Sequence, residues 1–200
     1  MKDKKTLKMV QIAILTAVLL LMAFTPLGYL RLGPFPITLL VIPVAVGAML
    51  IGPEAGALLG LIFGLTSFAQ CFGADPTGVI LLDINPFYTF VVCVPTRMLM
   101  GYGAGAIFRA LRKVDRTRTV SYFAGGVLAA VLNTVFFMGA LILCFWNTEY
   151  VQGLYQSQGG GSILLFLTAM VGLNGVVEAL ACGAAGGLIS KGVSKALKMD

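Results

Sequence analysis

The stretch AAVLNTVFFMGALIL, residues 129–143, is apolar almost throughout, yet Asn133 and Thr134 stand in its middle. Its apolar residues form one long run instead of alternating with polar ones, which predicts a membrane-spanning helix and not a strand. An amide left without partners in hydrocarbon costs several kcal/mol, so Asn133 needs hydrogen bonds from the protein, from water or from a ligand.

The composition of the whole chain supports a membrane environment. Of its 200 residues, 58% are hydrophobic and 11% are charged, whereas soluble domains carry about 25% charged residues. A bilayer offers the backbone no hydrogen bonds, so only helices or closed barrels span it, and the long apolar runs favour helices. We therefore expect an all-α membrane protein that forms one compact domain over residues 1–200.

Lysine and arginine orient the predicted helices, because cytoplasmic loops retain these residues. They gather at residues 2–8, 109–118 and 191–198, and only Arg31 and Arg97 lie elsewhere. If all three clusters share one side, an even number of helices separates each from the next. Both termini are therefore predicted to be cytoplasmic. This topology accounts for the net charge of +6, so we expect no nucleic-acid binding.

The sequence predicts six transmembrane helices in one bundle. They cover residues 9–24, 37–51, 54–69, 86–111, 119–146 and 162–188. The outer connections between them are predicted to be loops, and they are long and rich in turn-forming residues. Because loops on a rigid scaffold commonly carry binding groups, we expect the outer face to perform recognition.

Several kinds of site are missing from the sequence. The chain contains no histidine, which excludes a Ser-His or Cys-His nucleophile and a His-ligated metal. The cysteines form no C-x-x-C pair, and no nucleotide-binding G-x-x-x-x-G-K-[ST] loop occurs. We therefore expect a non-catalytic chain without metal or cofactor, whose energy comes from a gradient or a partner.

Polar groups inside the predicted helices fall at one depth. Arg97, Asn133 and Asn174 each lie roughly 16 to 21 Å along their helices, near the middle of the membrane. Glu178 follows Asn174 by one helical turn on the same face. Two interpretations stay open: these groups line a ligand cavity, or Arg97 pairs with Glu178 while the amides join the helices.

Small residues recur at helical spacing, as in Gly56, Gly60 and Gly64 and again in Ala13 and Ala17. Such stripes let helix backbones approach closely in lipid. Packing within the bundle is the usual role, but one stripe is available for a different polypeptide.

Five segments in this order resemble the substrate-binding S component of an energy-coupling factor (ECF) vitamin transporter. They are AILTA, FPITLLVIPVAVGAMLIGPEAGALLGLIFGL, PTRMLMGYGAGAIFRALRK, LNTVFFMGALIL and NGVVEALACGAAGGLI. The resemblance covers nearly the whole chain. It implies a multi-pass protein of the prokaryotic plasma membrane that binds a vitamin in a cavity opening outward. It also implies that Ala13 and Ala17 dock on a transmembrane coupling protein (the T component), which is joined to two subunits that hydrolyse ATP.

The resemblance also implies a substrate site on the outer side. The predicted substrate-binding residues are Arg97, Asn133, Asn174, Thr134, Gln70, Asn85 and Tyr88. Arg97 favours an anionic vitamin, and pantothenate, which carries a carboxylate, hydroxyls and an amide, fits such a site first. Folate, riboflavin or another vitamin stays open.

One alternative belongs to a different functional class. A stand-alone secondary carrier driven by protons or sodium would need an intramembrane carboxylate, and Glu178 is its best candidate.

Overall fold

The computed structural model describes residues 2–30, 37–115, 119–157, 162, 172 and 174–196, and it is almost entirely helical there. Within these residues, four helices are long and apolar enough to cross a membrane: Lys5–Ala23, Pro86–Val114, Val120–Phe145 and Asn174–Ala196. The predicted helical membrane bundle is therefore confirmed at this level. Of the predicted basic positions, Arg31, Arg116, Arg118 and Lys198 lie outside the described residues.

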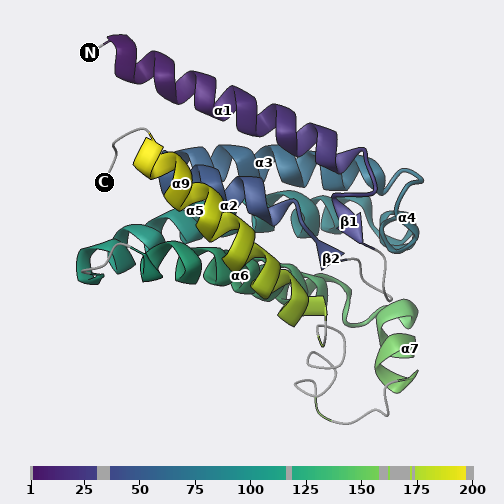
Figure 1. Cartoon of the computed structure of the whole chain (residues 1–200). Coiled ribbons are helices and arrows are strands. Elements are labelled where there is room, and N and C mark those ends of the chain that lie inside the picture. The colour runs from purple at the N-terminus through teal and green to yellow at the C-terminus, as the bar shows by residue number, and fades with distance from the viewer. Residues whose placement is uncertain are drawn as a thin grey trace.

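The long helices lie side by side, as Figure 1 shows. Helix α1 (Lys2–Ala23) lies at one edge of the bundle against α3 (Pro53–Gln70), and α3 packs on α5 (Pro86–Val114). Helix α6 (Val120–Phe145) packs on α5, and the last helical segment crosses α6. This segment contains a π-helical turn, η1 (Cys182–Gly186), before α9 (Gly187–Ala196).

Glycines bring α3 and α5 into close contact. A Cβ atom on Gly56 would clash with the main-chain carbonyl of Gly101, and one on Gly60 would clash with that of Arg97. The Gly56, Gly60 and Gly64 stripe therefore packs inside the bundle. It fixes the distance between α3 and the turn of α5 that carries Arg97.

The second predicted helix is shorter than expected. Helix α2 (Val41–Leu50) has 10 residues, because the chain first forms strand β2 (Ile37–Thr38), which pairs with β1 (Tyr29–Leu30). Ile37, Leu40 and Val41 are fully buried. The apolar run beginning at Ile37 thus reflects burial inside the protein, and helix formation starts only at Val41.

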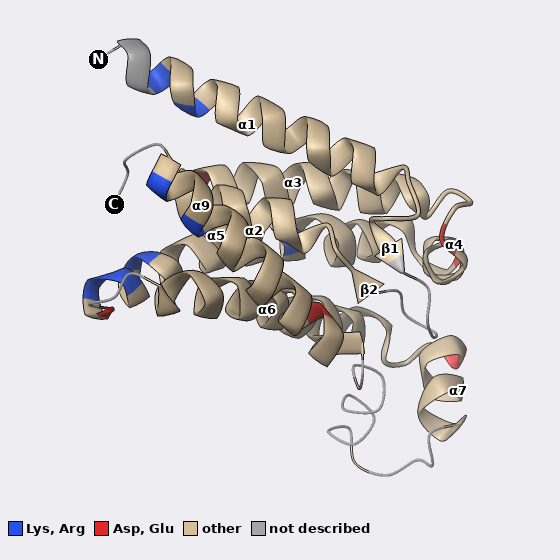
Figure 2. Cartoon of the chain, viewed as in Figure 1, with Lys and Arg blue, Asp and Glu red and all other residues tan. Residues whose placement is uncertain are grey.

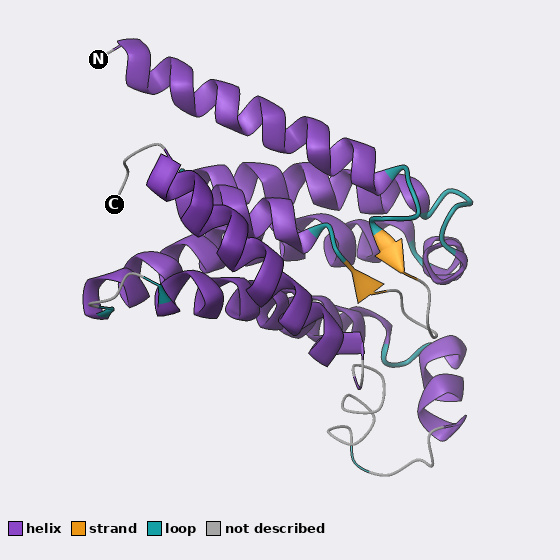
Figure 3. Ribbon diagram, in the orientation of Figure 1, coloured by secondary structure: helices purple, strands orange, loops and turns teal. Residues whose placement is uncertain are grey.

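The predicted outer loops contain two short helices that their sequences do not signal by hydropathy. Helix α4 (Pro76–Ile84) is capped by Asp75, whose Oδ2 accepts a hydrogen bond from the Gly78 main-chain nitrogen at 3.0 Å. Helix α7 (Glu149–Ser157) follows α6. These helices and the β1–β2 hairpin lie at the end of the bundle opposite the termini (Figures 1 and 3).

The sixth predicted helix ends later than expected. It was predicted to stop at residue 188, but helical structure continues to Ala196. Its predicted first residue, Ser162, is not helical, and residues 163–171 and 173 lie outside the described part of the chain.

Basic residues gather at the end that holds the termini. Figure 2 shows lysine and arginine at the start of α1, the end of α5 and the end of α9. Acidic residues occur on α4 and α7 at the other end, and a few also occur at the basic end. The three basic clusters thus share one end of the bundle, as the sequence analysis expected.

Candidate functional site

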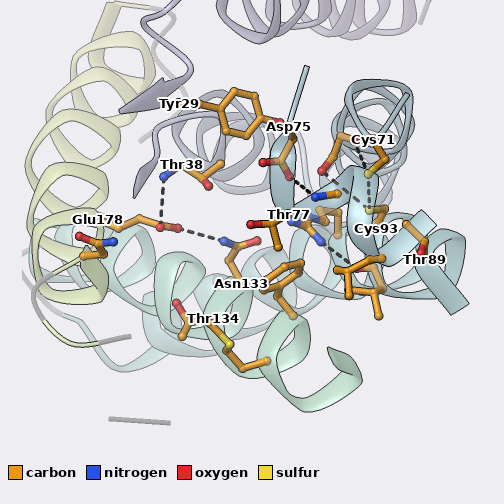
Figure 4. Close-up of a pocket in the computed structure, with 18 of the residues that line it drawn as sticks. Tyr29, Thr38, Cys71, Asp75, Thr77, Thr89, Cys93, Asn133, Thr134 and Glu178 are labelled. Atoms are coloured by element: carbon orange, nitrogen blue, oxygen red, sulfur yellow. Dashed lines mark hydrogen bonds between the residues drawn. The ribbon is translucent and has the colours of Figure 1, made fainter. Parts of the chain in front are cut away.

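A cavity of about 90 Å³ lies between α3, α4, α5, α6 and the last helix, beneath the β1–β2 hairpin. Such a volume holds several water molecules. Four of the predicted residues line it: Arg97 from α5, Asn133 and Thr134 from α6, and Asn174 from the last helix. Residues distant in sequence therefore meet at one place. Figure 4 shows that Thr38, Asn133 and Glu178 meet on one side, with Cys71 and Cys93 on the other.

Arg97 is buried and fixed by its own helix. Its Nη1 donates to the carbonyl of Val92 at 2.7 Å and to Thr96 Oγ1 at 3.4 Å. These bonds draw the guanidinium back toward the start of α5, as expected because helical side chains lean toward the N-terminus. The guanidinium also lies 4.4 Å from the Phe137 ring centroid and 5.2 Å from that of Phe63. Backbone and aromatic contacts together set its orientation.

Glu178 takes its partners from elsewhere. Its Oε1 accepts a hydrogen bond from Asn133 Nδ2 at 3.0 Å, and its Oε2 accepts one from the Thr38 main-chain nitrogen at 3.4 Å. Among the described residues, Arg97 and Glu178 form no ion pair within 4.0 Å. The interpretation in which these two residues pair is therefore wrong in this structure. Glu178 instead joins α6 to the hairpin.

Three buried polar atoms of the cavity have no hydrogen-bonding partner among the described residues. They are Arg97 Nε, Asn133 Oδ1 and the hydroxyl oxygen of Tyr29. Burial raises the pKa of the Tyr29 phenol, so this group stays a protonated donor. Stranding a buried polar group costs roughly 1–3 kcal/mol. Unused donors and an unused acceptor therefore converge where a polar ligand or water would satisfy them.

The other three predicted residues lie outside the lining of this cavity. Gln70 Nε2 donates to the carbonyl of Ala23 at 2.7 Å and so ties α3 to the end of α1. Asn85 caps α5 by accepting a hydrogen bond from the Tyr88 main-chain nitrogen at 3.1 Å. Tyr88 is 42% exposed, and its ring lies 6.0 Å from that of Phe145. Each of these three residues contacts other parts of the protein and does not line the cavity.

Several polar residues that line the cavity were not predicted from the sequence. Tyr29 and Thr38 come from the hairpin, Asp75 and Thr77 from the start of α4, and Thr89 from α5. The Asp75-Pro76 pair is a helix-start signal that could have revealed α4 and its place at the outer end. The return of the hairpin over the cavity depends on tertiary packing.

The residues that were predicted to dock a partner lie apart from the cavity. Ala13 and Ala17 are exposed on α1, on which Ile14 and Leu21 are also exposed.

Comparison with known proteins agrees with the sequence resemblance. The family model described as "ECF transporter, substrate-specific component" matches residues 7–185. The chain is 26% identical over 183 residues to the pantothenate transporter PanT of Leuconostoc mesenteroides, covering 89% of this chain and 87% of that protein. It is 27% identical over 173 residues to the pantothenic acid transporter PanT of Lactococcus lactis, covering 76% and 84%, respectively.

Proposed function

The chain belongs to the family of ECF transporter substrate-specific components, and we propose that it binds pantothenate for import. It is a multi-pass protein of the prokaryotic plasma membrane and a transport subunit, not an enzyme. Two relatives that are named for pantothenate transport support the choice of substrate.

One observation carries the proposal: the buried and unpaired Arg97 Nε and Asn133 Oδ1 line the same cavity. Arg97 would bind the carboxylate of pantothenate, since a guanidinium matches a carboxylate in charge and in its forked geometry. Asn133, Thr134 and Asn174 would bind the hydroxyl and amide groups, for which they offer both donors and acceptors. Tyr29 would add a donor from the hairpin.

We further propose that the chain crosses the membrane six times, with both termini in the cytoplasm. Helix α2, at about 15 Å, is too short to cross roughly 30 Å of hydrocarbon alone. The buried stretch from Ile37 to Leu40 would complete this crossing, because non-helical backbone is tolerated at membrane depth when protein surrounds it.

Import itself would depend on partners. The exposed Ala13 and Ala17 would dock on the transmembrane coupling protein, and the two ATPase subunits joined to it would use ATP. The competing function is a self-sufficient carrier in which Glu178 couples uptake to protons or sodium. The buried position of Glu178 in the cavity favours that role. Its hydrogen bonds to Asn133 and Thr38 favour a structural one.

The test is uptake of labelled pantothenate by cells that lack their own pantothenate transporter. We expect uptake when this chain is co-expressed with a coupling protein and active ATPase subunits, and none when the ATPases carry inactivating substitutions. Uptake by this chain alone, abolished by dissipating the proton or sodium gradient, would instead establish the secondary carrier. Uptake of folate or riboflavin in place of pantothenate would keep the family role but change the substrate.

A further inference from the structure

A second hollow, of about 350 Å³, opens at the opposite end of the bundle from the candidate substrate site. It lies between the end of α2 and the last turns of α5, and we call it the basic hollow. Three cations line it: Arg109, Arg112 and Lys113. They follow one another on the final turns of α5, within the basic end of the molecule (Figure 2).

The acids near the basic hollow leave an excess of positive charge. Glu54 lies 3.6 Å from Arg109, but both side chains are largely exposed, and water screens such pairs so that they hold each other only weakly. The Asp115 side chain accepts a hydrogen bond from the Ser121 main-chain nitrogen at 2.7 Å. Exposed Arg109 and Lys113 are thus available to an added anion.

The floor of the basic hollow is apolar. Met49 and Phe108 are buried there, and Leu50 and Ile51 are half-buried beside them. Gly52 leaves the space into which Arg109 reaches, since a Cβ atom on Gly52 would lie 2.6 Å from Arg109 Nη2. Cations at the rim and hydrocarbon below suit an amphipathic anion better than a free one.

The position along α5 matches the headgroup layer of a membrane. With 29 residues, α5 is about 43 Å long, whereas the hydrocarbon core is about 30 Å thick. Centred on the bilayer, a helix of this length extends about 6 Å past the hydrocarbon at each end, so the last turn of α5 reaches the depth of lipid phosphates. Basic pockets between helices at this depth commonly bind anionic headgroups.

We propose that the basic hollow binds an anionic phospholipid. Arg109 and Lys113 hold its phosphate, and Met49, Ile51 and Phe108 contact the first carbons of an acyl chain. This site is independent of the vitamin that the protein carries.

The test measures lipid binding to the purified full-length chain in a neutral detergent by native mass spectrometry. The probes are short-chain phosphatidylglycerol, short-chain phosphatidylcholine and inorganic phosphate. We expect phosphatidylglycerol to bind and the other two to bind weakly. The double variant Arg109→Gln with Lys113→Gln should bind phosphatidylglycerol on the order of tenfold more weakly than the parent protein. Lys8→Gln with Lys195→Gln removes the same charge from the same end and should change binding little.

Each remaining outcome overturns part of the proposal. Equal binding of phosphatidylcholine would remove the role of charge, and equal binding of inorganic phosphate would make the hollow a free-anion site. A similar loss in the Lys8 and Lys195 control would show diffuse attraction and no site. Ile51→Gln keeps every cation but makes the floor of the hollow more polar. Unchanged affinity for phosphatidylglycerol in this variant would show that the apolar floor does not contribute to lipid binding. Unchanged melting temperatures of the unliganded variants verify that all of them fold.

Discussion

Replacement of Arg97 by methionine should weaken pantothenate binding strongly while leaving the fold intact. Nη1 is held by Val92 and Thr96, and Nε has no partner, so the ligand would gain a charge-assisted hydrogen bond at Nε. Such a bond is worth about 1.5–3 kcal/mol, and every 1.4 kcal/mol is tenfold in affinity. The dissociation constant should therefore rise roughly ten- to a hundredfold.

The fold should tolerate this change. Methionine fills much of the same volume against Phe137 and Phe63, and the Val92 carbonyl keeps the hydrogen bond from Thr96 Oγ1. Arg97→Lys serves as the matched control, because it keeps the charge but loses the planar, forked donor group. Its affinity for pantothenate should lie between that of the parent protein and that of Arg97→Met. Isothermal titration calorimetry and melting temperature are measured on the same samples. Unaltered affinity in Arg97→Met would refute the assignment of this residue to the ligand.

Three further predictions address docking, coupling and packing. Ala13→Leu or Ala17→Leu should abolish cellular uptake but not pantothenate binding by the purified chain. Ile14→Leu on the same helix is the control and should preserve both. Uptake that survives the two alanine changes would contradict docking of the coupling protein on Ala13 and Ala17. Glu178→Gln keeps the side-chain shape but loses one hydrogen-bond acceptor. Calorimetry should therefore show that the variant still binds pantothenate, and its melting temperature should fall modestly. Uptake by the parent protein that stops when the proton gradient is dissipated would instead support the secondary carrier. Gly60→Ala should push α3 away from the Arg97 backbone and lower both melting temperature and affinity, and wild-type values for both would contradict the close approach.

The sequence predicts the helices well where hydrocarbon is the solvent. Asn133 and Thr134 lie in α6 as expected, since a long apolar run in lipid has one way to satisfy its backbone. The same signal fails at Ile37, where burial within the protein gives an equally apolar run in a strand and a turn. Hydropathy measures exclusion from water, and it does not distinguish a segment that faces lipid from one that is buried inside the protein.

The depth of a residue along its helix predicts the cavity residues that lie on helices, but not those that the β1–β2 hairpin contributes. A fixed rise per residue brings Arg97, Asn133 and Asn174 to one level, and the structure places all three around one cavity. Tyr29 and Thr38 reach it through the hairpin, which depends on pairing across residues 31–36 and leaves no periodic signal. Gln70 meets Ala23 instead, because the ends of α1 and α3 lie together.

The most direct test of the central claim is mass spectrometry of small molecules released by denaturing the purified chain. The protein is expressed in rich medium and purified without added vitamins, and Arg97→Met is processed in parallel. We expect stoichiometric pantothenate from the parent protein and much less from the variant. A different vitamin, or equal amounts of pantothenate from both proteins, would contradict this account of the site.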